Sequence, residues 1–291
     1  MLENFETMEL EVEKGISIKT RKAGSGPPLL LLHGYPQTHA MWHKIAPRLA
    51  EDFTVVLTDL RGYGDSSKPE GGPEHINYSK RVMARDQAEV MAKLGYREFR
   101  LVGHARGGRV GHRLALDFPE RVQKLAVLDI APTYKMYTTT DKEFATAYYH
   151  WFFFIQPYDL PETLIGSNPE YFLRQIFGRW GANADVFDPA AMAEYLRCFS
   201  NPATVHASCE DYRASADIDL RHDEADMSKK VDCPLLALWG TKGLVGRKYD
   251  VLETWRERAS QVVGGQALPS GHYLPEEAPE ETYQALYQFL K

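Results

Sequence analysis

The sequence has few cysteines, no block of basic residues and no long apolar run, and each absence excludes a class of protein. The three cysteines are odd in number and show no C-x-x-C spacing, so Cys198, Cys209 and Cys233 predict free thiols rather than a disulfide framework or a zinc site. Residues 1–13 are rich in Glu and have no cationic start before an apolar run, which predicts that no signal peptide is present. Free thiols fit a reducing compartment, so we expect a cytoplasmic protein.

Charge and hydropathy argue against two kinds of partner. Lys and Arg together number 34 against 40 Asp and Glu, which gives a formal net charge of −6. A mildly acidic chain of this kind is a poor candidate for binding phosphate backbones. The apolar runs at 29–32 and 151–155 are far shorter than the roughly 20 residues that cross a membrane. We therefore expect neither nucleic acid nor a membrane as a partner.

Short apolar runs alternate with helical patterns along most of the chain. Runs this short and this free of polar residues are typical of strands covered on both faces. The alternation predicts class α/β, with a mainly parallel sheet and helices on both sides. An opening hairpin around Lys14-Gly15 precedes the apolar runs, which lie at 29–32, 54–57, 99–102, 125–128 and 235–238. The helical patterns lie at 41–50, 79–94, 109–116, 251–259 and 280–290.

The alternation stops between about Pro132 and Ala225, where aromatic residues are dense. We predict a helical cap, 132–225, inserted into a core domain formed by 1–131 and 226–291. A length of 291 residues allows two domains at about 150 residues each. The alternative is a separate helical domain with its own core, but no Gly/Ser linker flanks the segment.

Residues 101–109, Leu-Val-Gly-His-Ala-Arg-Gly-Gly-Arg, have the form of a nucleophile elbow. In that motif a tight strand-to-helix turn needs small residues on both sides of one central position, here Gly103 and Gly107, and exposes the central side chain above the sheet. The central residue is Ala105, whose methyl group cannot attack a substrate. An ordinary Gly-rich turn is the alternative.

Two other segments follow the order expected of an α/β-hydrolase fold. His-Gly-Tyr-Pro at 33–36 follows an earlier strand, where this fold supplies a backbone N–H for an oxyanion hole; we assign that role to the amides of Tyr35 and Arg106. Ser-Gly-His at 270–272 precedes the last helix, where the fold places its base, His272. With the elbow, these segments predict the α/β-hydrolase fold.

The acid partner of His272 is found by elimination. Thr241-Lys242-Gly243 after the strand at 235–238 offers no carboxylate, whereas the strand after the elbow helix ends at Asp129. We therefore predict that Asp129 orients His272. A turn or capping role is the alternative for Asp129.

Two arginines occupy an unfavourable place at the start of the elbow helix. Cations at a helix N-terminus oppose its dipole, at a cost of about 0.3–1 kcal/mol each. Arg106 and Arg109 are three residues apart and can share a face, so they predict a clamp for an anionic ligand such as a carboxylate. Pairing with surface acids is the alternative.

Motifs for metals and nucleotides are missing from the sequence. There is no P-loop, no H-E-x-x-H and no EF-hand loop. His39 and His43 have i, i+4 spacing but lack a third ligand, so we expect them on a helix surface. The sequence implies no cofactor and no metal.

The elbow Gly103-His-Ala-Arg-Gly107 resembles the Gly-His-Asp-Arg-Gly elbow of the fluoroacetate (haloacetate) dehalogenases, α/β-hydrolases with a helical cap. The resemblance extends over nearly the whole chain and rests on long strings. These lie at 33–38, 41–43, 124–130, 149–151, 209–213 and 270–277.

This resemblance implies a role for each residue singled out above. A carboxylate at position 105 would displace halide from a haloacetate and form an ester. His272, oriented by Asp129, would activate water to hydrolyse that ester to glycolate. Arg106 and Arg109 would hold the substrate carboxylate.

The resemblance also implies a halide site formed by His150, Trp151 and Tyr212. Hydrogen-bond donors at that place would stabilise the charge that develops on the leaving halide. The expected partner is a small haloacid substrate, and a homodimer is compatible with the sequence.

Ala105 departs from the family pattern, which has Asp at this place. We interpret the chain as an inactivated Asp-to-Ala form of a haloacetate dehalogenase. One alternative is a catalytically silent protein that binds small anions on the same fold. Another is an epoxide hydrolase that uses cap tyrosines such as Tyr148, Tyr149 or Tyr212, although a neutral epoxide gives the arginine pair nothing to bind.

Overall fold

One twisted sheet of eight strands organises the computed structural model, which describes residues 1–291 apart from the side chain of Ala184. The strands are β1 (Glu6–Glu13), β2 (Ile16–Ala23), β3 (Pro28–Leu32), β4 (Thr54–Thr58), β5 (Phe99–His104), β6 (Val122–Leu128), β7 (Leu235–Gly240) and β8 (Val262–Leu268). Their order is β1-β2-β4-β3-β5-β6-β7-β8, and the pairs from β4 to β8 are parallel, whereas β1–β2 and β2–β4 are antiparallel. The predicted α/β-hydrolase fold is confirmed.

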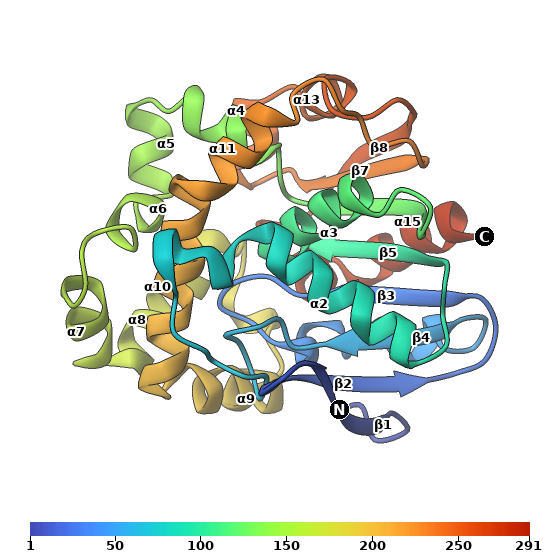
Figure 1. Cartoon of the computed structure of the whole chain (residues 1–291), viewed down its shortest axis with the longest axis horizontal. Helices are drawn as coiled ribbons and strands as arrows, with labels where there is room; N and C mark the ends of the chain where they lie inside the picture. Colours follow the sequence, from blue (N-terminus) through green and yellow to red (C-terminus); the bar gives the residue numbers. More distant parts are fainter.

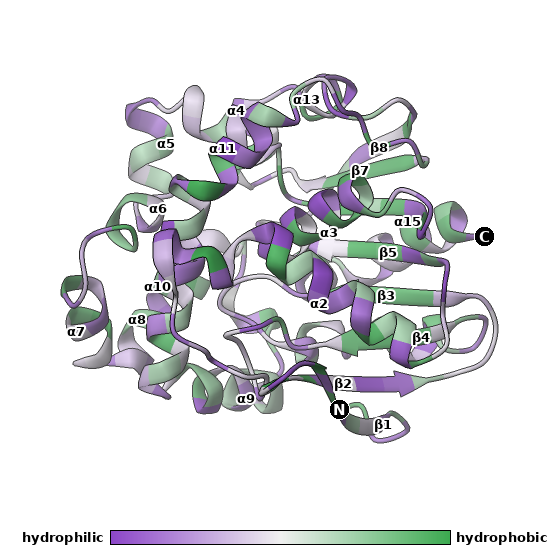
Figure 2. Cartoon of the chain, viewed as in Figure 1, coloured by the Kyte–Doolittle hydropathy of each residue, from purple (hydrophilic) through white to green (hydrophobic). Residues whose placement is uncertain are grey.

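The central strands are buried because helices cover the sheet. Leu29–Leu32 in β3 and all of β4 are buried, as their unbroken apolar sequences predict. Figure 2 shows green, apolar residues along β3 and β7 and purple, polar residues along β2. The helices of this part are α1 (Ala46–Leu49), α2 (Lys80–Lys93), α3 (Arg106–Asp117), α12 (Leu244–Lys248), α13 (Val251–Arg256), α14 (Leu274–Glu277) and α15 (Pro279–Leu290), with 3-10 turns at His39–Trp42 and Pro73–Tyr78.

A run of helices separates β6 from β7. In Figure 1 most of these helices lie beyond the end of the sheet toward which the β5 arrow points. The elbow lies at the same end of the sheet, because it follows β5 directly. They are α4 (Thr133–Thr138), α5 (Lys142–Ala147), α6 (His150–Phe153), α7 (Leu160–Gly166), α8 (Pro169–Trp180), α9 (Pro189–Phe199), α10 (Pro202–Ala216) and α11 (Ile218–Ala225), with a 3-10 turn at Ala184–Val186. The division into a core and a cap at 132 and 225 stays a prediction.

One expected helix is interrupted, and one strand was not expected. The helix expected over 41–50 is interrupted, because Pro47 lacks the N–H that would continue it and instead lies in the first turn of α1. Strand β8 was missed because Gly264 and Gly265 break its apolar pattern. A Cβ on Gly265 would lie 2.5 Å from the carbonyl oxygen of Ala237, so the close approach of β7 requires glycine there.

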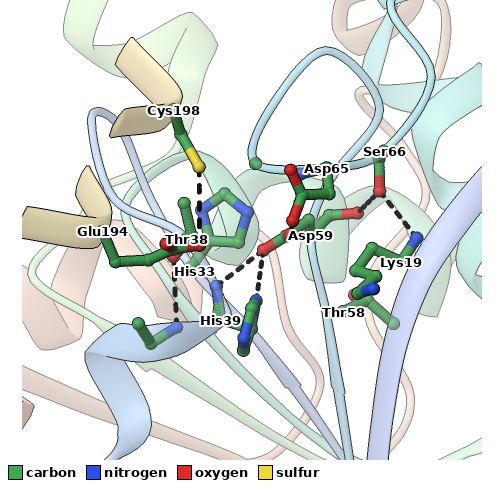
Figure 3. A network of polar contacts seen from close by, with 12 residues as sticks. Lys19, His33, Thr38, His39, Thr58, Asp59, Asp65, Ser66, Glu194 and Cys198 are labelled. Atoms are coloured by element: carbon green, nitrogen blue, oxygen red, sulfur yellow. Dashed lines mark hydrogen bonds and ion pairs between the residues drawn. The ribbon is translucent and has the colours of Figure 1, made fainter. Parts of the chain in front are cut away.

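His39 is buried, not on a helix surface as its spacing suggested. Its backbone N–H and ring Nδ1 contact Asp59 Oδ1 at 2.8 and 2.7 Å, and the hydroxyl of Ser66 donates to the Asp59 carbonyl (Figure 3). Burial alone would raise the pKa of Asp59, but His39 outweighs burial and holds that pKa below its usual range. This carboxylate joins the loops that follow β3 and β4.

Within the described residues, no helix combines the length and apolar character that crossing a bilayer would require. No cluster of three or more His, Cys, Asp or Glu side chains in the same residues could hold a metal ion.

Candidate active site

The elbow places Ala105 between the end of β5 and the start of α3. Ala105 has φ +46° and ψ −114°, a backbone conformation that non-glycine residues rarely adopt. A Cβ on Gly107 would lie 2.4 Å from the carbonyl oxygen of His33, and one on Gly103 would lie 2.5 Å from that of Gly107. The flanking glycines are therefore required, as the motif predicts.

His272 and Asp129 meet beside the elbow. His272 Nδ1 contacts Asp129 Oδ2 at 2.6 Å, and Asp129 Oδ1 accepts a 3.0 Å bond from the backbone N–H of Gly240. The His272 loop is held from both sides, because its backbone N–H donates to the Trp180 carbonyl and its carbonyl accepts from His104 Nε2. One carboxylate oxygen thus faces the imidazole while the other is held by β7, which fixes the orientation of the ring.

A small cavity of about 20 Å³ lies over the elbow. That volume exceeds the ~10–15 Å³ needed to admit one water molecule, so the site suits a ligand of very few heavy atoms. The residues around it are mostly aromatic or cationic. They are Tyr35, Ala105, Arg106, Arg109, Asp129, Ile130, Tyr148, His150, Trp151, Trp180, Tyr212 and His272.

Arg106 is anchored by an acid from the helical insertion. Its Nη2 and Nε contact the carboxylate of Asp211 in α10 at 2.6 and 2.9 Å, and Nη2 also donates to Ser215 Oγ. Burial would lower the pKa of Arg106, but Asp211 outweighs burial and raises that pKa above its usual range. Nη1 is buried and has no partner among the described residues, which leaves one donor nitrogen for a ligand.

Arg109 is buried with no carboxylate partner in the described part of the chain. Nη1 donates to the Ala131 carbonyl and to Thr133 Oγ1, and the guanidinium lies 4.8 Å over the ring of Trp151. Burial and the charge of Arg106 lower the pKa of Arg109 to about 10. A buried cation without a negative partner is costly, because hydrogen bonds to neutral groups offset only part of its loss of hydration.

The residues expected to form the halide site come together at the same cavity. The ring centroids of His150 and Tyr212 are 5.3 Å apart, and those of Trp151 and Tyr212 are 6.3 Å apart. Burial, His272 and the two arginines hold the pKa of His150 well below its usual range, so this imidazole is neutral. His150 Nδ1 is buried without a hydrogen-bond partner among the described residues.

The tyrosines considered for epoxide binding divide into two groups. Tyr148 and Tyr212 line the cavity, whereas Tyr149 is half-buried and lies outside the lining. Tyr35, expected to supply a backbone N–H, also lines the cavity with its ring. Its hydroxyl is buried without a partner among the described residues.

The sequence did not indicate a role for Trp180, Ile130 or Asp211. Trp180 and Ile130 line the cavity, and Asp211 anchors Arg106 from behind it. Asp211 lies within the string 209–213 that carries the family resemblance, and that was the only sequence signal that could have indicated it. Its partner is 105 residues away in the sequence, so no local pattern predicts the pair.

Comparison with known proteins assigns the family. The family model described as alpha/beta hydrolase fold matches residues 27–279, and the chain belongs to this family. The chain is 46% identical over 291 residues to the fluoroacetate dehalogenase of Burkholderia sp, which covers 100% of this chain and 95% of that protein. It is 35% identical over 274 residues to the soluble epoxide hydrolase of Corynebacterium sp. (strain C12), and the match covers 92% of this chain and 91% of that protein. A crystal structure from Nostoc sp PCC 7120, described as an α/β hydrolase, matches with a TM-score of 0.98 and 68% sequence identity. The match covers 100% of this chain and 99% of that chain.

Proposed function

We propose that this site evolved to hydrolyse haloacetates, and that the chain with Ala105 binds the substrate without turning it over. One observation carries the proposal: Arg109 is a buried cation beside the elbow with no carboxylate partner in the described structure. A substrate carboxylate would supply the missing negative charge. The small cavity and the similarity to the Burkholderia dehalogenase support a substrate as small as haloacetate.

The proposed reaction has two steps and requires a carboxylate at position 105. In the first, one carboxylate oxygen attacks the α-carbon, the carbon–halogen bond breaks, and halide leaves with the bonding electrons. In the second, His272 removes a proton from water, which attacks the ester carbonyl and releases glycolate. Asp129 contacts the opposite ring nitrogen at 2.6 Å and stabilises the imidazolium that forms.

Replacing Arg109 with Leu should weaken fluoroacetate binding by at least about tenfold, or about 1.4 kcal/mol. The same change should raise the melting temperature of the unliganded protein, because it removes a buried charge that burial and Arg106 disfavour and that no carboxylate in the described structure pairs with. Calorimetric titration and a thermal melt measure the two effects.

Fluoroacetamide, which has no carboxylate, is the matched control ligand. It should bind weakly and equally to the unchanged chain and to Arg109→Leu, whereas Arg109→Lys should retain part of the fluoroacetate affinity. Equal affinity of the unchanged chain for fluoroacetate and fluoroacetamide would contradict the clamp.

Replacing Trp151 with Phe in an Ala105→Asp background should reduce fluoroacetate turnover far more than chloroacetate turnover. Fluoride is the stronger hydrogen-bond acceptor, so it depends more on the indole N–H that Phe lacks. Phe keeps an aromatic face for the Arg109 guanidinium, which isolates the loss of the donor. Rates of halide release with both substrates provide the test, and equal losses would remove Trp151 from the halide site.

Epoxide hydrolysis is the second candidate, because Tyr148 and Tyr212 line the cavity and could polarise an epoxide oxygen. The relative from Corynebacterium sp. is named for that reaction. Arg109 argues against it, since a neutral epoxide would leave this buried charge without a carboxylate partner, whereas Asp211 already pairs with Arg106. Assaying the Ala105→Asp form with fluoroacetate and with styrene oxide in parallel distinguishes the two functions.

A further inference from the structure

A second cavity of about 250 Å³ lies directly beside the active-site cavity. Its walls come from α5, the end of α8, the loop after β7, and α12, elements that are far apart in the sequence. The residues around it are Thr146, Ala147, Tyr148, Arg179, Trp180, Lys242, Gly243, Leu244, Arg247 and His272. We call this space the vestibule.

Tyr148, Trp180 and His272 line both the vestibule and the active-site cavity, so they form the wall between them. They retain 7%, 8% and 7% exposure, whereas Arg106, His150 and Tyr212 deeper in the cavity retain 2% each. The wall therefore belongs to the more exposed part of the cavity lining.

Two side chains of the wall are not held by hydrogen bonds. Trp180 Nε1 and the Tyr148 hydroxyl are buried and have no partner among the described residues. Rotation of either side chain would break no hydrogen bond within the protein. Opening the wall would break ring contacts, such as those of Trp180 with His150 and Tyr148, but no hydrogen bond, and it would join the vestibule to the cavity over Ala105.

The charged side chains that line the vestibule are all cationic. Arg179 and Lys242 are exposed and form no ion pair within the described structure. Arg247 pairs at 2.8 Å with Glu143, which does not itself line the vestibule. This local charge contrasts with the net charge of −6 of the whole chain, which repels an approaching anion. Cations gathered at the mouth of a cleft raise the local concentration of anions and their association rate.

We infer that the vestibule is an access site for small carboxylate anions, where Arg179 and Lys242 capture the anion before it passes the wall of Tyr148 and Trp180 to reach the arginine clamp. The inference rests on the proposed function, because it takes the haloacetate-binding cavity as the destination. It adds a second binding region, distinct from Arg106 and Arg109, that determines how fast the substrate arrives.

The test measures fluoroacetate association with the unchanged chain by stopped-flow tryptophan fluorescence, since Trp151 and Trp180 line the destination cavity. The variant Arg179→Glu/Lys242→Glu reverses both unpaired charges at the mouth. The matched control Lys14→Glu/Lys93→Glu makes the same change in net charge at two exposed positions away from the vestibule. Each protein is measured at low ionic strength and at high ionic strength.

The vestibule variant should associate about tenfold more slowly than the control at low salt, with a dissociation rate constant within about twofold. The difference should shrink at high salt, because screening acts on exposed charges. Equal association rates for the vestibule variant and the control at low salt would overturn the inference. A fluorescence signal that is absent even in the unchanged chain would instead overturn the proposed function, and the inference with it.

Discussion

An Ala105→Asp variant should release fluoride from fluoroacetate and form glycolate, whereas the chain with Ala105 should release none above background. Deleting a nucleophile costs several orders of magnitude, because the remaining site can only orient the substrate. The other parts of the proposed machinery are present: the clamp of Arg106 and Arg109, and the His272–Asp129 pair at 2.6 Å. A single substitution should therefore switch on the reaction.

The elbow can accept the larger side chain. Asp is one of the few non-glycine residues that tolerate positive φ, and the φ of +46° at position 105 is already adopted by Ala. Gly34 leaves space next to it, since a Cβ there would lie 2.5 Å from Ala105 Cβ. The variant should fold with little change in melting temperature.

Ala105→Asn is the matched control, because it has the shape of Asp without an attacking carboxylate. It should bind fluoroacetate and release no fluoride. Binding should be tighter in the Ala105 chain than in the Ala105→Asp form, since a carboxylate at 105 would repel the carboxylate of the substrate. A folded Ala105→Asp protein with no activity on any haloacetate would favour the silent anion-binding alternative.

The elbow and the His272–Asp129 pair could be predicted because local backbone geometry determines them. The tight turn at 105 requires glycine at 103 and 107, and that requirement is visible in the sequence. Asp129 could be found because the ends of parallel strands meet at one edge of a sheet, which leaves few places for an acid.

Other features of the site depend on contacts between distant segments. The sequence suggested that Arg106 and Arg109 act alike, but Asp211 neutralises only Arg106, and this pairing depends on how α10 packs against α3. The size of the cavity depends equally on where Trp180 is placed by the end of α8. A pattern of residues reports neither fact, because both arise from tertiary packing.

In the Ala105→Asp background, replacing His272 with Asn should stop the reaction after its first step. The attack on the α-carbon needs no base, so one equivalent of fluoride should be released in a single burst. Hydrolysis of the ester needs a base to activate water, and Asn has no basic nitrogen. The protein should therefore accumulate one carboxymethyl group on the carboxylate introduced at position 105, which intact-mass and peptide mass spectrometry would detect.

The side-chain amide of Asn is also a suitable donor to Asp129, whose other oxygen remains bonded to the Gly240 amide, so the variant should keep its fold. The Ala105→Asp protein with His272 intact is the control, and it should show continuous fluoride release with little adduct. If the His272→Asn form neither releases a burst nor carries an adduct while melting normally, His272 acts in the first step as well. Continuous turnover by that form would show instead that another group activates water, and His104, whose ring centroid is 4.6 Å from that of His272, would be the next residue to test.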